Sequence, residues 1–211
     1  MIITKVLRHK KFRDRYTVYI DGGLGFDVSA DVLQKFDLHI NQRIDDQTVE
    51  RITTAEAQHR AQSIALNYIS YRPRSSKEIV DHLMRKGYKK ELAQKIVKNL
   101  QSMKYVDDTE FARMFVRDRL KRRPSGYSML RHALIARGIS PAVVEKVLKE
   151  YVSDEKQLEA ARMLAEKRLG SFNGSHSNLD QRKLRNRIFN YLLRRGFSTE
   201  VAQKTVRTLI A

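Results

Sequence analysis

The chain has 211 residues, no cysteine, and 42 Lys and Arg against 24 Asp and Glu, which gives a formal net charge of +18. The length allows one large or two small domains with a core of their own, and the lack of cysteine excludes disulfides, thiol nucleophiles and cysteine-bound zinc. No apolar run is long enough to span a membrane, and the first residues lack the apolar stretch of a signal peptide. A chain without cysteine also fits a reducing compartment, so we expect a cytoplasmic protein.

The positive charge is concentrated after residue 54. Residues 1–54 hold 9 Lys and Arg against 8 Asp and Glu, whereas residues 55–211 hold 33 against 16, a surplus of +17. A field of this sign attracts polyanions and speeds their encounter with the protein. Solubility alone would explain a modest, evenly spread surplus, but a surplus of this size and position favours association with nucleic acid.

The first 54 residues indicate a small module that contains a β-hairpin. Residues 15–20 are rich in β-branched and aromatic side chains, and a glycine-containing turn separates them from residues 24–28. Residues 2–7 predict a third strand. Residues 29–36 predict a short helix with Ser29 as its cap, and a further helix is expected to begin near residue 46.

The rest of the chain contains an internal repeat centred on a glycine. Three segments align without gaps around Gly87, Gly138 and Gly196, each with apolar residues at helical spacing before it. Glycine takes the positive φ at which many helices end, so we expect the apolar residue after it to pack back onto the last turn. The cation before each glycine suits the negative end of the helix dipole; these cations are Lys86, Arg137 and Arg195.

Each glycine is expected to join the second and third helices of a three-helix unit. Ser140 and Pro141 form a cap and a first helical position after Gly138, and residues 110–114 match residues 159–163 in the helix that begins the unit. Asp107 with Glu110, and Ser75 with Glu78, have the spacing of a capping box; both pairs stand where helices are expected to start. The third unit has extra residues in a polar loop at 171–178.

We therefore predict a mainly α protein. Its expected parts are an N-terminal β/α module at residues 1–54 and three tandem three-helix repeats at residues 55–105, 106–151 and 152–211. One unit of this size buries only part of its apolar face, so stacked repeats should form an elongated curved array.

No arrangement of residues points to catalysis or to a metal. The glycines at residues 22–25 are not followed by Gly-Lys-Ser/Thr, so a turn explains them better than a nucleotide-binding loop. None of the six histidines has metal-ligand spacing, and Asp107 with Asp108 opens a helix, where capping is the simpler explanation. We expect no catalytic residue, no cofactor and no metal.

Clusters of cations near the helix ends are the candidate binding site. A helix dipole explains one or two cations at a helix end, but not five before Pro124. Aromatic residues are few, so we expect contacts with the nucleic-acid backbone and little sequence preference. We name the first basic corner (Arg72 and Arg74), the second (Arg117, Arg119, Lys121, Arg122 and Arg123) and the third (Arg182, Lys183, Arg185 and Arg187), which together with Arg131 are the candidate partner- and DNA-binding residues.

The chain resembles the RecX family of bacterial recombination regulators over essentially its whole length. The resemblance rests on residues 72–79 with Leu83 and residues 86–88, on residues 107–112, and on residues 126–138; the third repeat is more divergent. It implies a repeated three-helix array that modulates the RecA recombinase, chiefly by inhibition. Members bind in the groove of the RecA–DNA filament and block its extension or promote its disassembly.

The predicted function is therefore regulation of the RecA filament on DNA, with inhibition of its ATPase and strand exchange. This would limit homologous recombination, DNA repair and the SOS response. The expected partners are the RecA filament and, weakly and without sequence preference, single- and double-stranded DNA; we expect a monomer with no membrane contact. The alternative is a free-standing DNA-binding protein, non-specific or of helix-turn-helix type. Whether inhibition of strand exchange needs contact with the recombinase separates the two, and the +17 on the repeats disfavours a purely structural adaptor.

Overall fold

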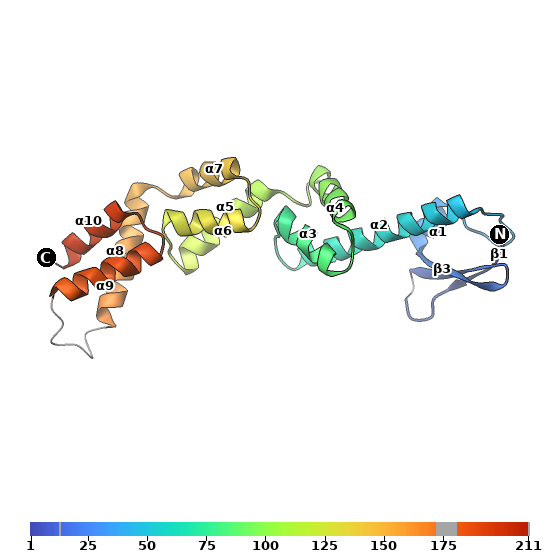
Figure 1. Ribbon diagram of the computed structural model, residues 1–211, viewed down its shortest axis with the longest axis horizontal. Coiled ribbons are helices and arrows are strands. Elements are labelled where there is room, and N and C mark those ends of the chain that lie inside the picture. The colour runs from blue at the N-terminus through green and yellow to red at the C-terminus, as the bar shows by residue number, and fades with distance from the viewer. Residues whose placement is uncertain (13, 172–180, 211) are drawn as a thin grey trace. The chain divides into compact units, whose positions relative to one another are not determined.

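A computed structural model describes residues 1–12, 14–171 and 181–210 and divides into two compact units. The first unit comprises Met1–Arg72 and Ile79–Met103, and the second comprises Pro73–Glu78 and Lys104–Ala211. The described residues form a three-stranded sheet and ten helices, which confirms the mainly α fold with a small N-terminal β module (Figure 1). Almost all of the polar loop expected at residues 171–178 lies outside the described residues.

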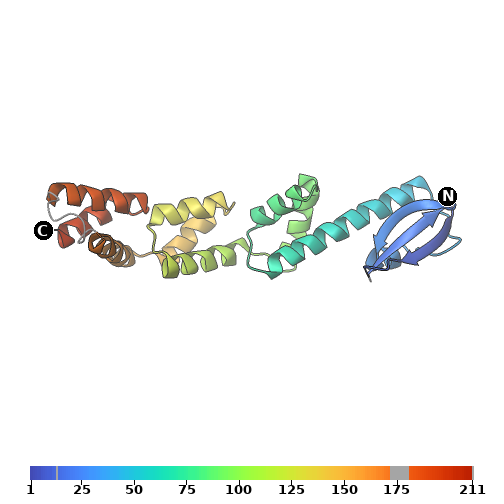
Figure 2. The ribbon, with the colours of Figure 1, turned by 90° about the horizontal axis from the view of Figure 1, so that it is seen from below.

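The N-terminal module is an antiparallel sheet followed by a short helix. Strands β1 (Ile3–Arg8), β2 (Arg15–Ile20) and β3 (Gly23–Ser29) lie in the order β1-β2-β3, so the predicted hairpin and third strand are confirmed. Helix α1 (Ala30–Lys35) begins where the Ser29 hydroxyl accepts a hydrogen bond from the Val32 backbone. Figure 2 shows the strands beside the beginning of the long helix that follows.

That long helix, α2 (Asp46–Ser70), connects the module to the first helix pair without a break. Asp45 caps it by accepting from the Thr48 backbone at 2.8 Å. Its first half packs Ile52 into the core of the sheet, and Ala61 and Ala65 are fully buried further along. The buried Glu56 carboxylate accepts a hydrogen bond of 2.7 Å from the Ser29 backbone and so joins α2 to the end of β3. The expected boundary between residues 54 and 55 falls inside this helix.

The remaining helices follow the repeat. Each three-helix repeat has a first helix and then a pair of helices joined at the glycine. A serine or aspartate caps the start of most of these helices. The elements are α3 (Ser76–Arg85) and α4 (Lys90–Ser102) after α2; α5 (Asp108–Arg122), α6 (Tyr127–Ala136) and α7 (Pro141–Tyr151); and α8 (Asp154–Gly170), α9 (Gln181–Arg194) and α10 (Thr199–Leu209).

All three glycines end their helices as predicted. Their φ angles are 91° at Gly87, 81° at Gly138 and 86° at Gly196. In each turn the backbone N–H after the glycine donates to the carbonyl five residues earlier, the bond that defines a Schellman motif. The bonds are Tyr88 to Leu83, Ile139 to Leu134 and Phe197 to Leu192, all at 3.2 Å.

The two predicted capping boxes differ in the structure. Ser75 and Glu78 form a reciprocal box, because each side chain accepts from the other's backbone N–H at 3.2 Å. Asp107 accepts from the backbone of Glu110, but the Glu110 side chain instead forms an ion pair with Arg113. The expected spacing at Asp107 therefore produces a one-sided cap.

Candidate nucleic-acid and partner interface

The second basic corner lies on the last turns of α5. Arg117, Lys121, Arg122 and Arg123 are exposed, and the Arg122 guanidinium forms an exposed ion pair with Asp118 at 2.7 Å. Arg119 differs, because its side chain is half-buried and its Nε is shielded from solvent. The predicted five-charge cluster therefore presents four exposed cations, and Arg119 belongs partly to the packing of the repeat.

The first basic corner lies in the segment between α2 and α3. Arg72 is exposed and ends the first segment of the first unit, whereas Arg74 is half-buried and belongs to the second unit. Ser75, next to Arg74, is fully buried. The two cations of this corner are thus unequal in their access to solvent.

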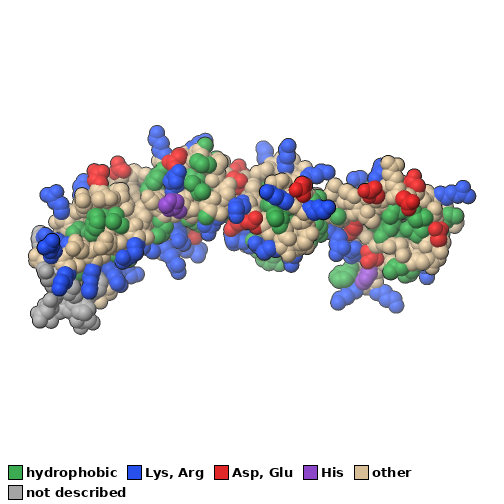
Figure 3. Space-filling view, viewed as in Figure 1, with side chains coloured by type: hydrophobic (Ala, Val, Ile, Leu, Met, Phe, Trp, Pro, Cys, Tyr) green, Lys and Arg blue, Asp and Glu red, His purple; other side chains and the backbone are tan. Residues whose placement is uncertain are grey.

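The third basic corner lies at the beginning of α9 rather than at the end of the first helix of its repeat. Cations at a helix N-terminus are opposed by the helix dipole, so capping does not explain why they are there. Arg185 has a structural role as well, since its Nε donates to the Ile210 carbonyl at the end of α10 at 2.8 Å. On the face shown in Figure 3, Lys and Arg side chains gather over α9; the exposed members of the corner are Arg182, Lys183, Arg185 and Arg187.

Sequence reasoning missed the cations that end α8. Lys167 and Arg168 lie in its last turn, which corresponds to the second basic corner on α5, and Arg168 stacks at 5.8 Å from the ring centre of Tyr191. The Arg-Leu pair at residues 168–169 matches the pair at residues 119–120, and this match is the sequence signal that could have identified the two cations.

Arg131 forms an ion pair with a carboxylate of its own repeat. Its Nε lies 2.9 Å from Glu145 Oε1, and Glu145 also accepts a hydrogen bond from the Tyr127 hydroxyl, so α6 and α7 are linked by this group of three. The hydrogen bonds from Tyr127 and Arg131 lower the pKa of Glu145, and the bond to Glu145 raises the pKa of Tyr127. The charge of Arg131 is therefore largely offset by a carboxylate of the same repeat.

Two of the three cations that precede the glycines, Arg137 and Arg195, hold carbonyl oxygens. Arg137 donates to the Ala133 carbonyl at 2.7 Å and stacks at 4.6 Å from the Phe115 ring centre. Arg195 donates to the Pro124 carbonyl at 2.8 Å, which reaches from the third repeat to the second. Arg137 therefore stabilises the end of its own helix, and Arg195 contributes to the contact between two repeats.

A backbone joint fixes the second and third repeats to each other. The Gly126 and Ser128 N–H groups donate to the Arg195 and Gly196 carbonyls at 2.8 and 3.1 Å. A side-chain contact joins the residues around the preceding glycine in a similar way, since the Ser75 hydroxyl donates to the Arg137 carbonyl at 2.7 Å. Within the second unit the second and third basic corners are thus carried by repeats that are bonded directly to each other.

The described residues contain no group of three or more metal-ligating side chains, and no helix among them is long and apolar enough to cross a membrane. One hollow in the third repeat lies between α8 and α10 and is lined by Leu158, Arg162 and Lys204 among others. The exposed arginines and lysines of the basic corners support ionic binding.

Comparison with known proteins identifies the family. Models of four RecX domains match in succession: the N-terminal domain over residues 1–45 and the first, second and third three-helix domains over residues 61–100, 107–148 and 154–206. The chain belongs to the RecX family. The match extends through the divergent third repeat, where the sequence resemblance is weaker.

Longer relatives, of which this chain covers about three quarters, share one name. Regulatory protein RecX of Listeria welshimeri is 32% identical over 96% of this chain and 74% of its own length, and that of Oceanobacillus iheyensis is 27% identical over 98% and 76%. A crystal structure of regulatory protein RecX matches with a TM-score of 0.78 and 29% identity over 96% of this chain and 97% of that one. RecX from Lactobacillus salivarius gives a TM-score of 0.64 and 27% identity over 74% and 97%.

Proposed function

We propose that this RecX-family chain binds the RecA filament on DNA and slows its ATPase and strand exchange, which would limit homologous recombination, DNA repair and the SOS response. The relatives are named regulatory proteins, which is consistent with action by binding rather than by catalysis. A filament on chromosomal DNA would place this action in the cytoplasm. The division into three repeats and the monomeric state belong to the same proposal.

The observation that carries the proposal is the direct bonding of two repeats that each bear exposed cations. Gly126 and Ser128 bond to residues 195 and 196, so the second and third basic corners are presented by one unit. Binding by two linked surfaces makes the second contact effectively intramolecular and raises the overall affinity. A filament offers such repeated contacts, because its protein and its DNA phosphates recur along its length.

Two exposed arginines of the second basic corner provide the test. Arg122→Glu with Arg123→Glu should relieve inhibition of ATP turnover on preformed RecA filaments at fixed salt. Lys10→Glu with Lys11→Glu is the matched control, because it makes the same change of charge at exposed positions of the N-terminal module. Unchanged ATP turnover and filament length at saturating wild-type protein would refute regulation of RecA.

The alternative is a free-standing DNA-binding protein, which the +17 on the repeats also favours. The same proteins distinguish it in a strand-exchange assay. If inhibition follows only the occupancy of naked DNA and disappears when recombinase is in excess over free DNA, the alternative is correct.

A further inference from the structure

The second repeat contains an ion pair that ties its first helix to its third. Arg113 on α5 contacts Glu150 on α7 through two hydrogen bonds, with Nε 3.0 Å from Oε2 and Nη2 3.2 Å from Oε1. This two-point geometry is the strongest way in which arginine binds a carboxylate. Lys146, one turn before Glu150, adds a second cation, and both cations lower the pKa of Glu150, Arg113 chiefly through its hydrogen bonds.

The third repeat keeps the two cations and lacks the carboxylate. Arg162 occupies the position of Arg113 in the matched segments, and Lys204 and Thr208 stand as far from Gly196 as Lys146 and Glu150 stand from Gly138. The Thr208 hydroxyl is used locally, because it donates to the Lys204 carbonyl at 2.9 Å. In the third repeat, the place that corresponds to the Glu150 carboxylate therefore receives no acidic side chain from α10.

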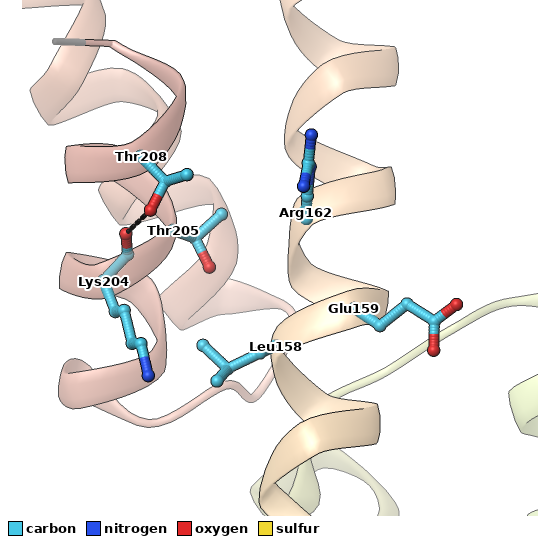
Figure 4. Close-up of a pocket in the computed structure, with 6 residues that line it drawn as sticks. All are labelled: Leu158, Glu159, Arg162, Lys204, Thr205 and Thr208. Atoms are coloured by element: carbon cyan, nitrogen blue, oxygen red, sulfur yellow. Dashed lines mark hydrogen bonds between the residues drawn. The ribbon is translucent and has the colours of Figure 1, made fainter.

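A cavity of about 280 Å³ occupies this place between α8 and α10. Figure 4 shows the Arg162 side chain along the edge of α8 that faces α10, and the Glu159 carboxylate turned away from α10. Thr205, on the wall of the cavity, is buried and donates to the Val201 carbonyl at 2.7 Å. Leu158 and the threonine methyl groups give the cavity an apolar wall beside its cations.

Arg162 forms an ion pair with Glu166 that runs along α8 instead of across to α10. The Arg162 Nε lies 2.8 Å from Glu166 Oε1, and the two side chains are 62% and 50% exposed. An exposed pair one turn apart on a helix is weak and is readily exchanged for a better partner. Arg113 and Glu150, in contrast, are only 28% and 36% exposed.

We propose that the cavity between α8 and α10 receives an acidic side chain of a partner protein, which takes the place that Glu150 fills from within the second repeat. The incoming carboxylate displaces Glu166 from Arg162 and is held by Arg162 and Lys204, while its methylene group packs on Leu158. The identity of the partner as the recombinase rests on the proposed function.

The charges around the cavity favour a protein carboxylate over a DNA phosphate. The cavity is lined by Arg162, Lys204 and one carboxylate, Glu159, and this small positive surplus suits a single carboxylate, whereas DNA binding depends on neutralising several phosphates. Its features are an arginine fork, a nearby lysine and an apolar wall, which suit one carboxylate on a short apolar stem. The first repeat has Gln62 and Asn99 at the matching positions and offers no such fork.

The sharpest test places a carboxylate in the cavity by substitution on α10 itself. Thr208→Glu should occupy the cavity and weaken binding to recombinase filaments by about 10- to 100-fold, the effect of losing hydrogen bonds to a charged group. Asn99→Glu is the matched control, since it adds the same charge at the equivalent exposed position of the first repeat, where Gln62 stands in place of the arginine. Glu166→Gln should have the opposite effect and tighten binding, because it removes the competing carboxylate; it also serves if Thr208→Glu fails to fold.

A zero-length cross-link identifies the occupant. A carbodiimide joins a lysine amine to a carboxylate with loss of water, and in the filament complex Lys204 should be linked to an Asp or Glu of the recombinase. This product should disappear with Thr208→Glu and persist with Asn99→Glu. Binding to naked DNA provides the second arm, in which Thr208→Glu and Asn99→Glu should agree.

The outcomes separate the two proposals. If wild-type protein fails to bind filaments, the proposed function is wrong and the cavity has no recombinase carboxylate to receive. If wild-type binds but Thr208→Glu and Asn99→Glu weaken filament binding equally, the cavity proposal is wrong and the proposed function stands. A greater loss with Thr208→Glu than with Asn99→Glu on naked DNA would overturn the carboxylate in favour of a phosphate.

Discussion

Replacing Gly196 by alanine should destabilise its repeat far more than replacing Gly87 does. At Gly87 an added Cβ meets no atom within 4 Å, so only the positive φ of 91° opposes alanine, at a cost of about 1 kcal/mol. At Gly196 the φ is similar, but the added Cβ would lie 2.4 Å from the Met129 backbone nitrogen. The joint must then move apart, which adds about 1–3 kcal/mol.

Gly138 provides the third member of the series. An added Cβ there would lie 2.5 Å from the Lys77 Cβ, a side-chain atom fixed to its backbone, so the cost should again exceed that at Gly87. Urea unfolding followed by far-UV circular dichroism measures the overall loss, and hydrogen exchange of α6 and α9 locates it. Equal losses at the three glycines would refute the idea that the joint, in addition to the helix turn, requires glycine.

Three other results are expected. Arg122→Glu with Arg123→Glu should weaken binding to unrelated DNA sequences alike and reduce the slope of log affinity against log salt by about two, which filter binding at several salt concentrations measures. The stabilisation by Glu145, whose pKa is lowered, is present at neutral pH and is lost as the pH falls below about 4.3, so Glu145→Gln should flatten the acid limb of a thermal-stability profile. Ser75→Ala removes both a helix cap and the bond to the Arg137 carbonyl, and should cost about 1–2 kcal/mol in thermal unfolding, whereas Ser63→Ala on the exposed face of α2 should cost little.

The helix ends were predictable because their determinants are local. A glycine with an apolar residue after it, or a serine before Pro141, specifies a turn or a cap within a few residues of chain. The strands of the N-terminal module were predictable for the same reason, since β-branched residues and a glycine turn stand next to each other in the sequence. These features depend on backbone geometry, which neighbouring residues largely decide.

The contacts between residues far apart in the chain were not predictable. Nothing near Ser75 indicates that its hydroxyl reaches the Arg137 carbonyl, and nothing near Arg185 indicates that it holds the end of α10. The change of charge after residue 54 also gave no information about the backbone, since α2 runs through it. Charge resides on side chains and does not interrupt the hydrogen bonds of a helix.

The matched positions of the repeats divide into those that are constrained and those that are free to differ. The glycine is the same in all three repeats because the helix turn demands it everywhere, and at Gly138 and Gly196 the close approach of a neighbouring segment demands it again. The surface between the first and third helices is under no such demand, and it differs in every repeat: Gln62 with Asn99, Arg113 with Glu150, and Arg162 with Thr208. An ion pair retained in one repeat and left half-complete in the next is thus a difference that the fold does not require, so its explanation has to be sought in what the third repeat binds.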